Sequence, residues 1–179
     1  MEIPDQRHRR GTLAASMITV DALTPDEWQI IRGVRLRSLQ DSPHAFTSTY
    51  QRELAFDEPA WRQRATTCQW FVATDDGAAV GVAGGIDGWS EDPTDRELVG
   101  MWVAPSHRGR GVARRLLDAV AAWAASVGAT TLRLGVREGN QGARAAYLRM
   151  GLQATGETMT SPGAPDESIE VMVLDLAHD

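Results

Sequence analysis

The stretch from Leu98 to Leu117 constrains the fold of this chain most, because it predicts a strand, a tight turn and a helix in immediate succession. An apolar run ends at Pro105, which cannot donate to a strand ladder. Gly109 and Gly111 then allow backbone angles and close approaches that a Cβ would block. Apolar residues return at helical spacing after the turn, at Ala113, Leu116, Leu117, Val120, Ala124 and Val127.

Four arginines cluster at the start of this predicted helix, namely Arg108, Arg110, Arg114 and Arg115. A helix N-terminus presents unpaired N–H groups and a partial positive charge, so it binds anions. Cations there oppose the helix dipole, each at a cost of about 0.3–1 kcal/mol. Because the chain has a formal net charge of −6, a phosphorylated ligand explains the cluster better than the alternative, a solvated basic face.

Two common phosphate-binding motifs do not fit this turn. A nucleotide-triphosphate loop ends in Gly-Lys-Ser/Thr, which is absent here. A dinucleotide-binding turn needs a small residue where this chain has Arg114, and it needs an acid about 20 residues further on, where 131–135 contain none. The turn therefore predicts another kind of phosphate ligand.

The pattern that does fit is Arg/Gln-x-x-Gly-x-Gly/Ala, which residues 108–113 match directly after Val103-Ala104-Pro105. With these residues the chain resembles the acetyl-CoA site of the GNAT N-acetyltransferase superfamily. The resemblance covers about residues 17–176 in order, and its sharp motifs lie within 96–152. They continue through 132–136, Asn140, Ala143, Ala146, Tyr147 and 150–152.

The resemblance implies acetyl-CoA as co-substrate and no metal. In GNAT enzymes, backbone N–H groups of this turn hold the pyrophosphate, arginines add charge, and the preceding strand pairs with the pantetheine arm and faces the thioester carbonyl. The cofactor contacts so implied are Met101, Trp102, Val103, Arg108, Gly109, Arg110, Gly111, Val112, Ala113, Arg114, Asn140 and Tyr147.

Tyr147 is the candidate general acid, because the resemblance places a tyrosine there near the departing sulfur. It follows Asn140 by about two helical turns, so both residues point to the same side of one helix. The alternative for Tyr147 is a core tyrosine. Asn140 is expected to cap the helix, and by resemblance it also contacts the pantetheine.

Glu97 is the candidate general base. It lies six residues before Val103, which matches the base carboxylate in the histone-acetylating branch of the superfamily. In the alternative interpretation, Glu97 is an acid exposed at the sheet edge beside Arg96. A water chain without a single base is a further alternative. The branch that acetylates ribosomal-protein N-termini has a glutamate where this chain has Gly135, so that branch's base is absent.

The acceptor is an amine-bearing small molecule or a protein lysine or N-terminus. By resemblance, Phe46, Tyr50 and Glu53 lie beside the acceptor pocket, and Trp89 is a further candidate. The alternative interpretation is a core aromatic pair and a surface acid. A closed aromatic pocket with Phe46, Trp89 or Trp102 would indicate a small molecule, and a shallow acidic groove a protein. A non-catalytic acetyl-CoA-binding module is the remaining alternative.

The whole pattern predicts an α/β fold of GNAT type: a mixed, mostly antiparallel sheet with helices on both faces and one parallel strand–helix–strand crossover. Residues 17–179 are expected to form one domain after a disordered tail, 1–16, for which a partner-binding arm is the alternative. A capping box of Thr24 and Glu27, with Pro25, starts a helix that ends at 41–43. Its Arg32, Arg35 and Arg37 are expected on the exposed face, and 155–165 is expected to be a loop.

Composition narrows the partners. The acidic balance argues against nucleic acid, and no apolar run approaches the roughly 20 residues that span a bilayer. No secretory signal is expected in 1–16. A single cysteine, Cys68, fits a reducing cytoplasm, and no His or Lys near it in the sequence would depress its pKa, so it is not expected to be an acetyl carrier. A homodimer is an expectation from the family alone.

Overall fold

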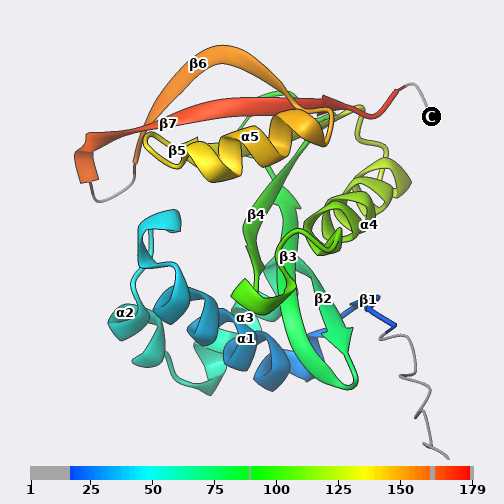
Figure 1. Cartoon of the computed structure of the whole chain (residues 1–179), viewed down its shortest axis with the longest axis vertical. Coiled ribbons are helices and arrows are strands. Elements are labelled where there is room, and N and C mark those ends of the chain that lie inside the picture. The colour runs from blue at the N-terminus through cyan, green and yellow to red at the C-terminus, as the bar shows by residue number, and fades with distance from the viewer. Residues whose placement is uncertain (1–16, 89, 162–163, 178–179) are drawn as a thin grey trace, which may run out of the picture.

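A computed structural model describes residues 17–88, 90–161 and 164–177. In this part of the chain seven strands form one sheet in the order β1-β2-β3-β4-β5-β7-β6 (Figure 1). The strands are β1 (Thr19–Ala22), β2 (Gln69–Asp75), β3 (Ala78–Asp87), β4 (Asp95–Val103), β5 (Thr131–Arg137), β6 (Gln153–Ser161) and β7 (Ala164–Asp175). Every neighbouring pair is antiparallel except β4 and β5. The predicted fold class is confirmed.

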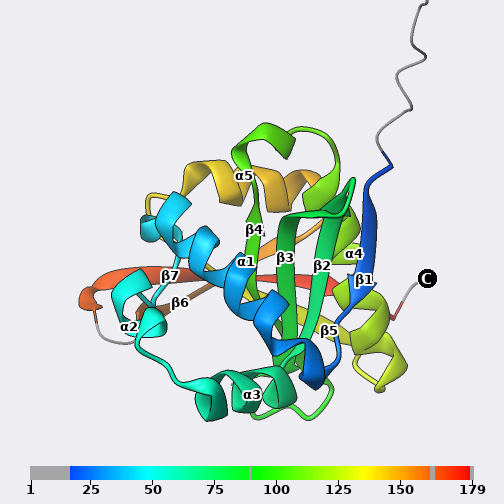
Figure 2. The same ribbon diagram turned by 90° about the horizontal axis from the view of Figure 1, so that it is seen from below.

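Helices cover both faces of this sheet. They are α1 (Trp28–Asp41), α2 (Tyr50–Leu54), α3 (Glu58–Thr67), α4 (Val112–Ser126) and α5 (Gln141–Arg149). On β3, a Cβ at Gly81 would meet Leu116 of α4, whereas one at Gly84 would meet Trp70 on the opposite face. Figure 2 shows α1 crossing in front of β4 and β3 on that second face. Because α4 connects β4 to β5, it carries the single parallel crossover.

Local sequence signals explain several element boundaries. The Glu27 carboxylate accepts a hydrogen bond from the Thr24 N–H at 2.8 Å, which confirms the capping box before α1. Asp76 and Gly77 both have positive φ, +49° and +78°, so β2 and β3 are joined by the tight turn that favours such residues. The Asn140 side chain accepts from the Ala143 N–H and caps α5, as predicted.

Residues 155–161 and 164–165 are in strands and not in the loop that the sequence predicts for 155–165; 162–163 lie outside the described residues. β6 runs through Gln153–Ser161 and pairs with β7, with shifts of register between Ala154 and Thr158. Gly156 has a φ of +81° within this irregular part. An edge strand needs only one partner, so it tolerates bulges and polar residues that a central strand would exclude. Residues 1–16 lie outside the described part of the chain.

A bulge in β4 shapes the centre of the molecule. Val82 of β3 lies opposite Trp102, and two residues further on Gly84 lies opposite Val99, so β4 carries one extra residue between these pairs. Gly100 occupies the bulge with a φ of +66°, a conformation that glycine adopts without a steric cost. The extra residue bends β4 and changes the direction in which its backbone groups point.

β4 and β5 separate just before the bulge in β4. Their parallel pairing ends with Glu97 opposite Arg133, although both strands continue, to Val103 and Arg137. The separation leaves one side of β4 without a strand partner in the middle of the sheet. Side chains from α1, α2, α3 and α5 lie around this opening.

Candidate active site

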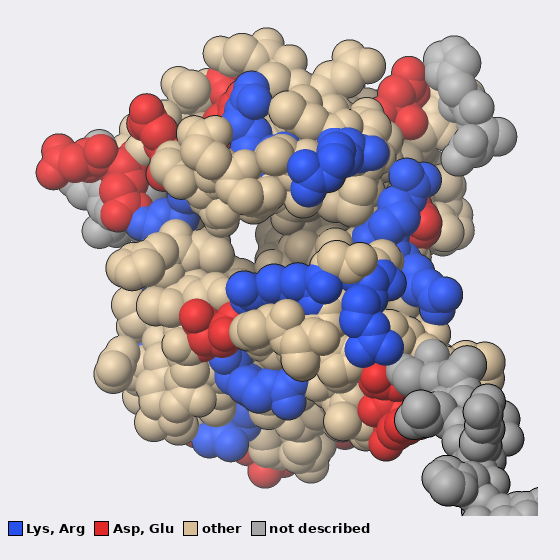
Figure 3. Space-filling view, in the orientation of Figure 1, with Lys and Arg blue, Asp and Glu red and all other residues tan. Residues whose placement is uncertain are grey.

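A cavity of about 530 Å³ lies where β4 and β5 separate. Figure 3 shows the surface hollowed between the part of the molecule that contains α5 and β5–β7 and the part that contains α1–α3. The cavity is lined from β4 by Glu97, Leu98, Val99, Gly100 and Met101, from β5 by Leu134, Gly135 and Arg137, and from α5 by Tyr147. Residues of α1–α3 and β2 form the opposite wall.

Glu97 is at the closed end of this opening. Glu97 is only 1% exposed, and it belongs to the last parallel pair before the strands separate. The alternative interpretation, an acid exposed at the sheet edge, is therefore wrong. A buried carboxylate that lines a cavity is placed to accept a proton from a bound molecule.

Tyr147 reaches the same cavity from α5. Burial raises the pKa of its phenol, because the charged phenolate would lose hydration. The phenol therefore stays protonated at neutral pH, as a proton donor must. The structure thus brings together the two side chains, Glu97 and Tyr147, that the sequence singled out for acid–base chemistry.

The turn before α4 is open, as an anion site requires. Gly109 and Gly111 have φ values of +75° and +79°, and a Cβ on either would meet nothing within 4 Å. Gly111 is the N-cap of α4, and no side chain caps this helix in the described structure. The N–H groups of its first turn therefore lack the side-chain acceptor that usually satisfies them. Such a helix start fits a pyrophosphate.

Arg108 joins this turn to the end of α1. Its Nη2 lies 2.5 Å from Asp41 Oδ2, and its Nε donates to the Val103 carbonyl at 3.0 Å. The same Asp41 oxygen accepts from Trp102 Nε1 at 2.8 Å. Burial alone would raise the pKa of Asp41, but these donors and the arginine charge lower it. Trp102 is buried in the core, so only its backbone is available to a cofactor.

The other arginines of the turn also have protein partners. Arg110 Nη1 lies 3.7 Å from Asp75, Arg114 Nε 2.8 Å from Asp118, and Arg115 Nη1 donates to the Ile18 carbonyl at 2.6 Å. The side chains of Arg108, Arg110 and Arg114 remain 43–58% exposed. These guanidinium groups are therefore accessible from solvent to a phosphate.

Only part of the predicted acceptor wall lies at the cavity. Phe46 and Glu53 line it, whereas Tyr50 is not among the lining residues and packs against the hydrophobic core. Trp89 lies outside the described part of the chain. Glu53 is 0% exposed, so the alternative of a surface acid is wrong.

Arg35 is the residue that the sequence reasoning misplaced. It was expected on the exposed face of α1, but it is 5% exposed and holds Glu53. Its Nε and Nη2 donate to the Glu53 carboxylate at 3.0–3.3 Å. Burial would raise the pKa of Glu53, but the hydrogen bonds and charge of Arg35, together with Arg64, outweigh it and lower the pKa. Ile31 and Leu39 flank Arg35 by four residues each way, and this shared stripe was the available signal.

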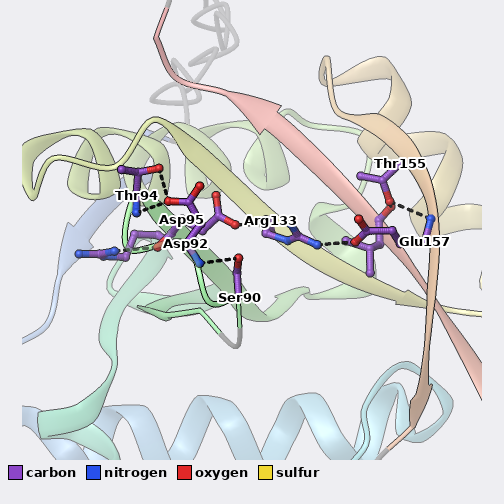
Figure 4. Close-up of polar contacts among 9 residues, drawn as sticks. Ser90, Asp92, Thr94, Asp95, Arg133, Thr155 and Glu157 are labelled. Atoms are coloured by element: carbon purple, nitrogen blue, oxygen red, sulfur yellow. Dashed lines mark hydrogen bonds and ion pairs between the residues drawn. The ribbon is translucent and has the colours of Figure 1, made fainter.

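A second polar group fixes the end of the strands where the cavity begins. Figure 4 shows Arg133 of β5 between Asp95 of β4 and Glu157 of β6. Arg133 Nη1 lies 3.4 Å from Asp95 and its Nη2 lies 2.6 Å from Glu157. These contacts therefore link β4, β5 and β6 beside Glu97, where the parallel pairing of β4 and β5 ends.

Among the described residues, no group of three or more His, Cys, Asp or Glu side chains is placed to hold a metal ion. No helix in the same ranges is long and apolar enough to cross a membrane.

Comparison with known proteins assigns the chain to a family. Residues 35–152 match the sequence model of the Acetyltransferase (GNAT) family. The chain belongs to this family. The match confirms the family that the turn at 108–113 predicted.

Relatives and solved structures agree with this assignment. An uncharacterized N-acetyltransferase of Mycobacterium tuberculosis (strain H37Rv) is 38% identical over 106 residues, which are 59% of this chain and 66% of the relative. The chain thus matches somewhat less than two thirds of that relative's length. The structure of yncA of Salmonella typhimurium, solved with its cofactor acetyl-CoA, is 18% identical and covers 92% of this chain and 96% of its own, with a TM-score of 0.68. Nourseothricin acetyltransferase is 30% identical over 62% of this chain and 66% of its own, with a TM-score of 0.55.

Proposed function

We propose that this GNAT acetyltransferase moves the acetyl group of acetyl-CoA to a primary amine by direct attack, with both molecules bound at once. One observation carries the proposal: Glu97, Tyr147 and the bulged backbone at Gly100 all line one cavity, which opens at the separation of β4 and β5. Acyl transfer to an amine needs a proton acceptor, a proton donor and a group that polarises a carbonyl, and these three features meet there.

The chain's own residues fit the cofactor. The uncapped N–H groups from Gly109 to Ala113 would hold the pyrophosphate, and Arg108, Arg110 or Arg114 would add charge. The free side of β4, including the backbone of Met101, would pair with the extended pantetheine arm as an added strand does. The Val103 carbonyl already accepts from Arg108, so Val103 would take part through its N–H. When bound, acetyl-CoA supplies an activated thioester.

Each proton in the reaction then has a place to go. Glu97 takes a proton from the acceptor ammonium, directly or through one water, and leaves a nucleophilic amine. Main-chain N–H groups at the bulge stabilise the negative charge that develops on the carbonyl oxygen. As the carbon–sulfur bond breaks, Tyr147 gives its phenolic proton to the sulfur. Burial raises the pKa of Tyr147, so the phenol carries its proton when the transfer begins. The second proton that the attacking nitrogen loses returns to the phenolate, directly or through a water, and Glu97 releases its proton to solvent.

The test is steady-state kinetics of free-thiol release with a panel of amines. Tyr147→Phe and Glu97→Gln each remove one proton-transfer group, so kcat is expected to fall by about 10²- to 10⁴-fold in each variant, with acetyl-CoA affinity retained. Tyr50→Phe is the matched control, because Tyr50 does not line the cavity, and it is expected to leave kcat unchanged. Full activity in both site variants would refute these proton-transfer roles, and no turnover of any amine by the wild type would leave the non-catalytic binding module as the better account.

The shape of the cavity favours a small-molecule acceptor over a protein. The acceptor side is walled by Phe46 and Trp70, and its charge is not that of a shallow acidic groove, because four arginines and two glutamates line the cavity. The likeness to nourseothricin acetyltransferase also supports a small molecule, since that protein's name gives a small-molecule acceptor. Turnover of a peptide amine at a kcat/KM higher than that of any small amine would favour the protein alternative.

A further inference from the structure

Beneath the bulge lies an arginine that the proposed chemistry does not use. The Arg35 side chain is 7% exposed, and its guanidinium carbon stacks 4.4 Å from the centre of the Phe46 ring. Two of its nitrogens are bonded to Glu53, but Nη1 is buried and has no hydrogen-bond partner among the described residues. A Cβ built on Gly100 would lie 3.8 Å from this Nη1. A buried, unused charged donor therefore lies beside the proposed reaction centre.

The charge around Arg35 is also unbalanced. Arg64 Nη2 lies 3.6 Å from the same Glu53 oxygen that Arg35 contacts, so one carboxylate serves two guanidinium groups. Within the described part of the chain, Arg64 Nε is another buried nitrogen without a hydrogen-bond partner, and burial lowers the pKa of Arg64. The group of Arg35, Glu53 and Arg64 therefore has one more positive than negative charge, and the Arg64 side chain is 33% exposed.

We propose that the acceptor is an amino acid, whose carboxylate binds Arg35 Nη1 and Arg64 while its neighbouring amine faces the bulge and Glu97. This inference rests on the proposed function, because it assigns the acceptor's second group at the same cavity. Since Nη1 lies beside Gly100, the carboxylate and the reacting amine must be only a few bonds apart. Phe46, Phe56 and Trp70 line the same wall, so the amino acid's side chain is apolar.

The first test varies the carboxylate of the acceptor molecule, which requires no mutation of the protein. Wild-type kcat/KM is measured for L-leucine and L-phenylalanine and for their primary amides, which keep the amine and the side chain but lose the charge. A charge-assisted hydrogen bond predicts a kcat/KM at least about tenfold higher for the acids. Amides that react as well as the acids would overturn the proposal.

A binding measurement separates this inference from the proposed function. N-acetyl-L-leucine and N-acetyl-L-phenylalanine, and their amides, are titrated by calorimetry into the protein saturated with coenzyme A. Binding of an acid at least about tenfold tighter than its amide supports the carboxylate site even if no amine is turned over. Equal affinities, or no binding by either acid, would overturn the inference, whereas acetyl-CoA binding and transfer to another amine would leave the proposed function intact.

Two variants test whether the preference for the acid over the amide depends on Arg35. Arg35→Gln is combined with Glu53→Gln so that neither partner is left as a lone buried charge, and folding is checked by thermal melting. The preference for acid over amide is expected to shrink to within about threefold of unity in this double variant. Arg52→Gln removes a cavity-lining charge outside the Arg35–Glu53–Arg64 group and is expected to keep the preference. Loss of the preference in Arg52→Gln alone would contradict a site at Arg35.

Discussion

The buried Arg35–Glu53 pair makes the fold sensitive to one carboxylate. Glu53 is 0% exposed and receives three contacts from Arg35 at 3.0–3.3 Å, with Arg64 at 3.6 Å. Removing one partner of a buried pair costs about 3–5 kcal/mol, because the other charge stays buried without compensation. A glutamine at position 53 still accepts a hydrogen bond, so Glu53→Gln is expected at the lower end, about 3 kcal/mol.

Urea unfolding at pH 7, followed by circular dichroism, measures this loss. For a chain of this size, about 3 kcal/mol corresponds to a fall in Tm of roughly 6–12 °C. Glu58→Gln is the control, because Glu58 forms a 2.8 Å ion pair with Arg62 on the surface of α3 and both side chains are about half exposed. That change is expected to cost at most about 0.5 kcal/mol. Losses of equal size in the two variants would refute the argument from burial.

The pH dependence gives a second check on the same pair. Folding lowers the pKa of Glu53 from its ordinary value of 4.5, so its ionised form is favoured in the folded state. The stability it contributes is complete above the unfolded pKa and disappears as the pH falls through the folded value. The difference between wild type and Glu53→Gln should therefore shrink on acidification below pH 4.5. A difference that stays constant down to pH 3 would contradict an ionised Glu53.

Further predictions follow from other positions. Gly100→Ala places a Cβ 3.1 Å from the Trp70 ring at a φ of +66°, so it should lower the unfolding free energy by about 1–3 kcal/mol, and a cost below 0.5 kcal/mol in urea titrations would be inconsistent with the bulge geometry. Burial raises the pKa of the Cys68 thiol to about 12, so a thiol reagent at pH 8 should label it only after unfolding. Asp41→Asn removes the charge that holds Arg108 and should change the Michaelis constant for acetyl-CoA by less than about tenfold, as measured by initial rates.

Much of the fold was predictable where local physics decides it. The stretch from Leu98 to Leu117 contains its own strand, turn and helix signals, and the structure has β4 and α4 there. The caps at Thr24 and Asn140 followed from side chains that can reach nearby N–H groups. The edge strand β6 was missed because glycine and proline suggested a loop, while its pairing with β7 depends on residues distant in sequence.

The acceptor wall was the least predictable part of the site. Arginine at position 35 is usually a surface residue by type, and only its place between Ile31 and Leu39 on one helical stripe indicated burial. Its partner Glu53 comes from a five-residue helix, whose position is set by packing and not by local propensity. Ion pairs between elements far apart in sequence have no periodic signature, so the structure was needed to find them.

The central claim, that the turn before α4 and the neighbouring opening of the sheet bind acetyl-CoA, is tested most directly by a calorimetric titration of acetyl-CoA. Wild type is compared with Arg108→Ala/Arg110→Ala, which removes two cations of the turn, and with Arg62→Ala/Arg32→Ala, which removes two from elsewhere. The account predicts micromolar binding that weakens by at least about tenfold in the first variant only. No binding by the wild type, or equal binding by all three proteins, would contradict it.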